Sequence, residues 1–146
     1  MRSTYDQHVP LLSKDRWEKP RLEWLKCNVD AGRTTISACF RNSSGEFTTE
    51  LTKWQQVILS IDEGEVWALL QAMKEAKHKG FEQVQFESDS QLLVEAIRTK
   101  RRDNSEFLSI VNDIILIKLS CANFEVKFIR RQVNLVAHTL ARAANS

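Results

Sequence analysis

The stretch Leu25-Lys26-Cys27-Asn28-Val29-Asp30 decides the fold, because its apolar and polar residues alternate with the period of a half-buried strand that ends in a carboxylate. A second stretch, Val84-Gln85-Phe86-Glu87-Ser88-Asp89, alternates in the same way and ends just before an apolar helical stretch. The sequence therefore presents two carboxylates, Asp30 and Asp89, at the ends of two expected strands.

A third acid, Glu65, lies on the apolar stripe of an expected helix, because apolar residues follow it at helical offsets: Leu69, Ala72, Met73 and Ala76. A carboxylate on a core-facing stripe costs free energy unless it is paired or bound to a metal ion. Together with Asp30, Asp89 and the imidazole of His138, it predicts a divalent-metal site. The structural alternative is that each Asp forms a turn or caps a helix, as Ser88-Asp89-Ser90 would do.

The remaining pattern predicts an α/β domain with a mixed five-stranded sheet flanked by helices. Expected strands cover residues 24–30, 34–41, 46–54, 83–88 and 124–130. Expected helices cover residues 62–79, 90–99, 105–119 and 134–144. Three antiparallel strands come first, and helices and strands alternate after them. A length of 146 residues with 42% hydrophobic content suits a single compact domain.

Four segments resemble, in order, the motifs of the ribonuclease H fold. They are KCNVD at residues 26–30, EGEVWAL at 63–69, FESDS at 86–90 and RQVNLVAHTLAR at 131–142. The closest resemblance is to the retrotransposon-derived, reverse-transcriptase-like ribonuclease H type 1 domains abundant in plants, and it begins at the Trp17-Glu18-Lys19-Pro20 lead-in. We expect an N-terminal arm or linker over residues 1–20 and a ribonuclease H-like domain over residues 21–146.

The resemblance implies a metal-dependent endonuclease that cleaves the RNA strand of RNA–DNA hybrids with two Mg²⁺ or Mn²⁺ ions. By the same resemblance, Asp30 bridges both ions, and Glu65 and Asp89 hold the ion nearer the leaving group. Two cations close together need several carboxylates to offset their mutual repulsion. The fourth catalytic and metal-binding position, normally Asp, is His138 in this chain. An imidazole is a poor ligand for Mg²⁺ and brings no negative charge, so activity is expected to be weakened.

His138 has two interpretations. If Asn134 is the N-cap of the last helix, His138 lies in its first turns, where the positive helix end favours a neutral ring that coordinates metal or accepts a proton. The alternative is that His138 only packs or hydrogen-bonds beside the acids. A further departure from the family is Phe128, where many members carry His; the alternation of residues 124–129 predicts a core Phe.

Basic residues cluster in two places, although the net charge is only +2. Lys100-Arg101-Arg102 occupies an expected loop, and Arg130-Arg131 precedes the last helix. With Asn134, they are the expected nucleic-acid contacts, because cations that neutralise phosphates supply salt-sensitive affinity. The alternative is a solvated, charged surface. The partner is expected to be an RNA–DNA hybrid or another duplex.

Other features set the expected compartment and the competing functions. The longest apolar run, 114–117, is too short to span a bilayer, and residues 1–10 contain no signal-peptide core, so we expect an intracellular protein, nuclear or cytoplasmic, without membrane contact. Cys27, Cys39 and Cys121 are expected to be reduced, buried thiols.

The main alternative function is a catalytically inactive domain of retrotransposon origin that binds nucleic acid or a protein. A small α/β interaction domain with coincidental acids is a third.

Overall fold

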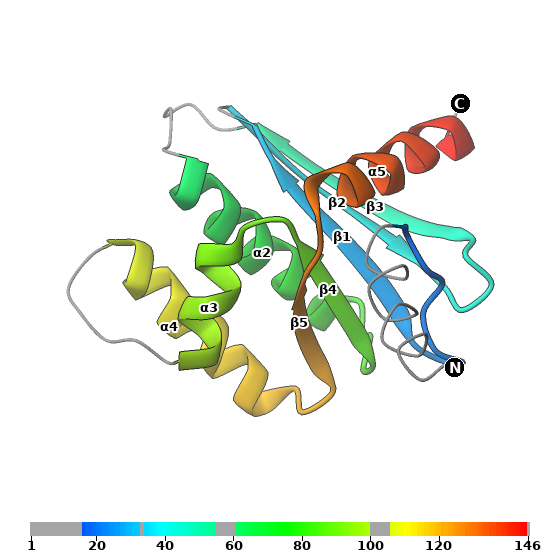
Figure 1. Ribbon diagram of the computed structural model, residues 1–146. Helices are drawn as coiled ribbons and strands as arrows, with labels where there is room; N and C mark the ends of the chain where they lie inside the picture. The colour runs from blue at the N-terminus through cyan, green and yellow to red at the C-terminus, as the bar shows by residue number, and fades with distance from the viewer. Residues whose placement is uncertain (1–15, 33, 55–60, 100–105, 146) are drawn as a thin grey trace, which may run out of the picture.

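The computed structural model describes residues 16–32, 34–54, 61–99 and 106–145 (Figure 1). Its strands are β1 (Leu25–Ala31), β2 (Thr35–Arg41), β3 (Phe47–Trp54), β4 (Val84–Ser88) and β5 (Phe124–Phe128). Its helices are α2 (Ile61–His78), α3 (Gln91–Thr99), α4 (Glu106–Ser120) and α5 (Arg131–Asn145). The described elements follow the order expected from the sequence.

The five strands form one mixed sheet in the order β3-β2-β1-β4-β5. Strand β1 pairs antiparallel with β2, and β2 antiparallel with β3, whereas β4 pairs parallel with both β1 and β5. The predicted fold class is therefore confirmed. Because β1 and β4 are parallel, their carboxyl ends lie at the same edge of the sheet.

One face of the sheet carries the apolar core. Alternate residues of the strands, among them Val29, Phe40 and Phe86, are fully buried and belong to one cluster with residues of α2, α3 and α4. The Phe86 ring meets the rings of Phe40 and Phe124 at centroid distances of 6.4 and 5.2 Å. Truncating such a ring to Ala typically costs about 3–5 kcal/mol. This core fixes the relative positions of α2, β1 and β4, which carry the three acids.

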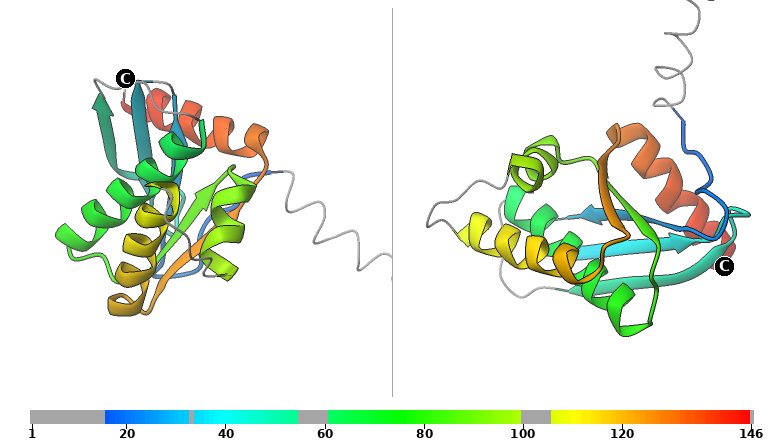
Figure 2. Two further views of the ribbon diagram at one scale, coloured as in Figure 1. Left: turned by 90° about the vertical axis from the view of Figure 1, so that its left-hand side faces the viewer. Right: turned by 90° about the horizontal axis from the view of Figure 1, so that it is seen from below.

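The opposite face of the sheet is polar, yet it is also covered. Helix α5 stands apart from α2, α3 and α4 and contacts β1, β2 and β3 (Figure 2). Four buried polar side chains lie on this face: Lys26, Asn28, Arg41 and Glu87, of which Asn28 and Arg41 hydrogen-bond to α5. Trp17 adds to this cover, because its Nε1 donates a hydrogen bond to Asn28 Oδ1 at 2.9 Å. The alternating pattern predicted a half-buried β1, whereas both of its faces are buried.

Two sequence predictions near the last helix are wrong. Helix α5 begins at Arg131 and not at Asn134, because the Arg130 carbonyl already accepts hydrogen bonds from the backbone N–H groups of Val133 and Asn134. Strand β5 ends at Phe128, which is 43% exposed and not a core residue. Within the described residues, no helix has the length and apolar character needed to cross a membrane.

Candidate metal centre

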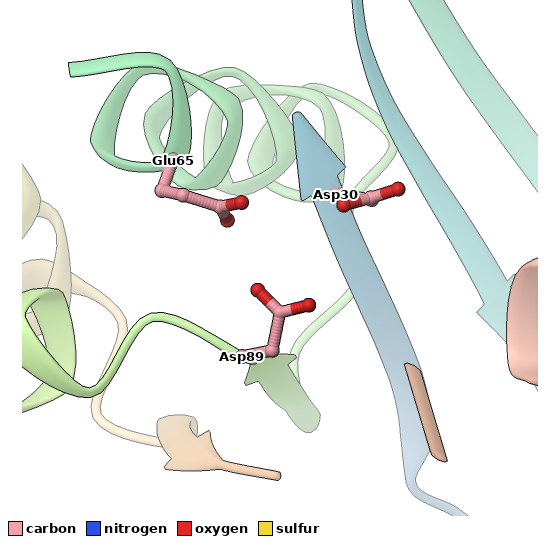
Figure 3. Close-up of side chains that lie close together, drawn as sticks. All are labelled: Asp30, Glu65 and Asp89. Atoms are coloured by element: carbon pink, nitrogen blue, oxygen red, sulfur yellow. The ribbon is translucent and has the colours of Figure 1, made fainter. Parts of the chain in front are cut away.

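Three carboxylates from three different elements converge at one edge of the sheet. Asp30 is the second-last residue of strand β1, Glu65 lies in the first turns of α2, and Asp89 follows β4 directly. One ligand oxygen from each of them lies within 4.8 Å of the others. Figure 3 shows the three side chains facing a common space between α2, β1 and β4. The three acids that the sequence singled out are therefore close enough to share a cation.

Strand register explains why two of these acids meet. Asn28 of β1 lies beside Glu87 of β4 in a parallel pair. Two residues further along each strand, Asp30 and Asp89 are brought to the same level on the same face, since side chains alternate with a period of two. Glu65 reaches them from α2, whose neighbouring residues Val66 and Leu69 are held in the core. The site is thus a product of ordinary sheet and helix packing.

The electrostatics of the cluster are unfavourable to the charged forms. Glu65 is only 2% exposed, and its pKa is raised to about 8, first by burial and then by the charges of Asp89 and Asp30. Its Oε2 atom is buried and accepts no hydrogen bond. The pKa of Asp89 is also raised, by burial and then by Asp30. A bound divalent cation would relieve both the burial cost and the repulsion.

Arg131 partly offsets this repulsion. Its Nη1 lies 3.5 Å from Asp89 Oδ2 and lowers the pKa of that carboxyl. The Arg131 side chain is 65% exposed, so solvent screens the interaction. Arg130 is exposed as well. The other expected basic contacts, Lys100, Arg101 and Arg102, lie outside the described residues.

His138 lies outside the set of three acids. Its Nδ1 is 3.2 Å from Cys39 Sγ and 3.5 Å from Ser37 Oγ, so the ring is held against β2. It is close enough to Asp89 to lower the pKa of that carboxyl. Since α5 starts at Arg131, His138 lies well inside the helix, beyond the first turn where the positive helix end would favour a neutral ring. The Nδ1 contacts thus lie beside the acids, and a role of His138 as a metal ligand stays a prediction.

Asn134 has a different role from the expected nucleic-acid contact. Its side chain is fully buried; Nδ2 donates to the Val29 carbonyl at 2.8 Å, and Oδ1 accepts from Asn28 Nδ2 at 3.3 Å. A hydrogen bond from Asn134 also lowers the pKa of Asp89. Asn134 therefore joins α5 to β1 beside the cluster, which makes it a positioning residue.

Sequence reasoning missed the buried polar network that continues from Asn134. Asn28 Nδ2 donates to Glu87 Oε1 at 2.9 Å, and Lys26 Nζ lies 3.2 Å from Glu87 Oε2. Arg41 donates to the Ala137 carbonyl at 2.6 Å. The sequence does hold one signal for this network. The expected final helix has an apolar side that must pack on a face of the sheet, so the polar side chains of that face would be buried and would need hydrogen-bond partners.

A family model describing reverse transcriptase-like domains matches residues 26–144. The chain belongs to the reverse transcriptase-like family. No curated protein matches it in sequence. The segment of this chain that the family model matches contains all three clustered acids as well as His138 and Asn134.

Solved structures of ribonucleases H share the fold of this reverse transcriptase-like domain. Ribonuclease H1 from the halophilic archaeon Halobacterium salinarum is 17% identical, with a TM-score of 0.65 over 84% of this chain and 97% of that chain. The N-terminal ribonuclease H domain of a Mycobacterium tuberculosis protein is 16% identical, with a TM-score of 0.68 over 83% and 92%. LC11-RNase H1, solved in complex with an RNA/DNA hybrid, is 18% identical, with a TM-score of 0.64 over 83% and 94%. At these identities the likeness shows the ribonuclease H-like fold.

Proposed function

We propose that this chain is a metal-dependent endonuclease that hydrolyses the RNA strand of RNA–DNA hybrids. The observation that carries the proposal is the convergence of Asp30, Glu65 and Asp89, whose ligand oxygens lie within 4.8 Å of one another. The family membership and the hybrid bound by LC11-RNase H1 support the substrate class. An origin in a plant retrotransposon is part of the same proposal.

The donor set fits a hard divalent cation. Carboxylate oxygens are the ligands that Mg²⁺ and Mn²⁺ prefer, and a buried Glu with a pKa of about 8 is costly to ionise unless a cation is near. Asp30, Glu65 and Asp89 would hold the ion or ions. When bound, such ions polarise a phosphoryl oxygen and lower the pKa of water.

The residues around the acids orient them and receive the substrate. Asn134 ties α5 to β1 and hydrogen-bonds toward Asp89, which limits the positions that this carboxylate can take. Arg131 is exposed beside Asp89, where a guanidinium is suited to contact a substrate phosphate. No side chain is needed as a covalent nucleophile, because an activated water is the attacking group in this proposal.

A second candidate function is nucleic-acid binding without cleavage. The observation that favours it is the position of His138, which leaves three carboxylates in the cluster where the family pattern has a fourth. Fewer negative charges offset the repulsion of two cations less well. Binding would then persist, carried by exposed cations such as Arg130 and Arg131, while turnover would be lost.

The experiment is a cleavage assay on an RNA–DNA hybrid labelled on the RNA strand, with Mg²⁺ or with Mn²⁺. The proposal expects cleavage by the parent chain and none by Asp30→Asn. Glu82→Gln is a matched control, because Glu82 is an exposed acid before β4, at the opposite end of that strand from Asp89. Equal background cleavage by the parent and Asp30→Asn would overturn the nuclease proposal and favour the second candidate.

A further inference from the structure

A groove of about 780 Å³ lies beside α5, on the polar side of the sheet. Helix α5 contacts β1, β2 and β3, so it leaves β4 and β5 less covered on this side. The groove is lined by Gln85 and Glu87 of β4, by Lys127 of β5, and by residues of the segment 16–24 that leads into β1. None of the three acids lines it.

The groove is strongly positive. Six of its lining residues are Lys or Arg, and two are Glu. Glu87 is neutralised by Lys26, and Arg21 forms an ion pair with Glu125 at 2.8 Å. Lys19 and Lys127 also line the groove, and both are exposed. Since the whole chain has a net charge of only +2, this local excess favours an anionic ligand.

Two aromatic side chains in the groove indicate which kind of anionic ligand it binds. Trp24 and Phe128 both line the groove; Phe128 is 43% exposed, whereas Trp24 is half-buried and the Arg21 guanidinium lies 3.9 Å from its ring centroid. A positively charged groove with an exposed Phe ring and an Arg-stacked Trp ring in its wall is suited to single-stranded nucleic acid, whose phosphates contact the cations and whose bases stack on aromatic and guanidinium planes. An acidic peptide would satisfy the cations but would gain little from the rings.

One short segment of the chain, residues 128–131, contributes both to the groove and to the surroundings of the candidate metal centre. Phe128, Ile129 and Arg130 line the groove, and the next residue, Arg131, contacts Asp89. We propose that this groove binds the single-stranded continuation of a nucleic acid whose duplex part lies at the three acids. The proposal deepens the proposed function and rests on it for the position of the duplex, but binding in the groove is measurable without cleavage.

The first test measures the binding of fluorescein-labelled oligo(dT) and oligo(U) by anisotropy, in EDTA and on an Asp30→Asn background. We expect the double variant Lys19→Ala/Lys127→Ala to reduce the slope of log K against log salt by about 1.4, roughly 0.7 for each lost phosphate contact on a single strand. Phe128→Ala is expected to weaken binding about tenfold. Equal effects in Lys74→Ala/Lys77→Ala, a matched control on exposed positions of α2, would overturn the proposal.

The second test compares a blunt RNA–DNA hybrid with hybrids that carry a single-stranded overhang on either strand. A tighter complex with an overhang, lost in Lys19→Ala/Lys127→Ala, supports the groove. Equal affinity for blunt and overhanging hybrids overturns the proposal. The proposal also fails if poly-glutamate displaces the labelled oligonucleotide as well as unlabelled oligo(dT) of the same total charge does. Because both tests run without turnover, a failure of the groove is distinguishable from a failure of the nuclease proposal. Lys127→Glu, which reverses one charge of the groove, is a second variant for the same binding measurements. Thermal melting checks that each variant folds.

Discussion

The Nδ1 atom of His138 lies 3.2 Å from the Sγ atom of Cys39, on the face of β2 that α5 covers. This contact turns the imidazole toward the sheet and leaves Asp30, Glu65 and Asp89 as the group whose oxygens lie close together. His138 is thus held by β2 beside the acids and is not one of the three residues in the cluster. Its contribution to metal binding is directly measurable.

His138→Ala is expected to leave the affinity for Mn²⁺ almost unchanged, because the ring is not part of the carboxylate cluster. Asp30→Asn is expected to abolish that affinity, since it removes a ligand and a charge. Isothermal titration calorimetry on both variants makes the comparison. A loss of about tenfold or more in His138→Ala would instead identify the ring as a ligand or as a close support of one.

Glu65→Gln is expected to stabilise the metal-free protein at pH 7 by about 2–3 kcal/mol. At pH 7 the folded state must hold on Glu65 a proton that the unfolded state releases, and a neutral amide avoids this free-energy cost. Urea unfolding monitored by circular dichroism measures the change. The matched control Glu82→Gln should stay within about 0.5 kcal/mol of the parent. Destabilisation by Glu65→Gln would show that the carboxylate is already compensated in the absence of metal.

The stability of the metal-free protein is expected to fall as pH rises from about 4.5 to about 8, and to level off above that. In this window the folded state keeps a proton on Glu65, whose ordinary pKa is 4.5, while the unfolded state releases it. The raised pKa of Asp89 acts in the same direction. Unfolding free energies at pH 5, 7 and 9 test this trend, and Glu65→Gln should flatten it. A rise in stability across the window in the parent would contradict the account.

Metal affinity should show the opposite trend. A cation binds the ionised carboxylates, so the affinity for Mn²⁺ is expected to increase with pH up to about 8 as Glu65 loses its proton. Titration calorimetry in buffers of different ionisation enthalpy would also detect the released proton. Affinity that is independent of pH between 6 and 8, with no proton release, would exclude Glu65 as a titrating ligand.

Asn134→Ala is expected to destabilise the protein by about 1–3 kcal/mol, because it leaves the buried Val29 carbonyl and the Asn28 amide without their hydrogen bonds to α5. Gln132→Ala, at an exposed position of the same helix, serves as the control. Chemical unfolding of both variants gives the difference. Equal, small effects would mean that α5 is held by its other contacts alone.

The strand and helix order was predictable from the sequence because hydrophobic periodicity is read locally. The alternation at residues 25–30 and the apolar stripe that follows Glu65 each indicate a buried face. In the structure, the parallel pairing of β1 with β4 then brings Asp30 and Asp89 to the same edge of the sheet. The position of Glu65 was the strongest local signal, since a lone acid on a core-facing stripe requires compensation.

What could not be predicted depends on contacts between distant segments. Asn134 has the residue type of an N-cap, but its amide is used across 105 residues of sequence to reach Val29. Likewise, Cys39 alternates like a core residue yet faces His138 on the polar side of the sheet. Local pattern does not distinguish a polar strand face in water from one covered by a helix, so the network around Asn28 and Glu87 was missed.

The most direct test of the central claim, that three carboxylates form one divalent-cation site, is a crystal structure of the chain soaked in Mn²⁺, with anomalous diffraction locating the metal. The account predicts an anomalous peak within about 2.0–2.3 Å of oxygens from Asp30, Glu65 and Asp89, as for other hard divalent ions. Manganese bound elsewhere only, or carboxylates turned away from one another with no peak between them, would contradict it.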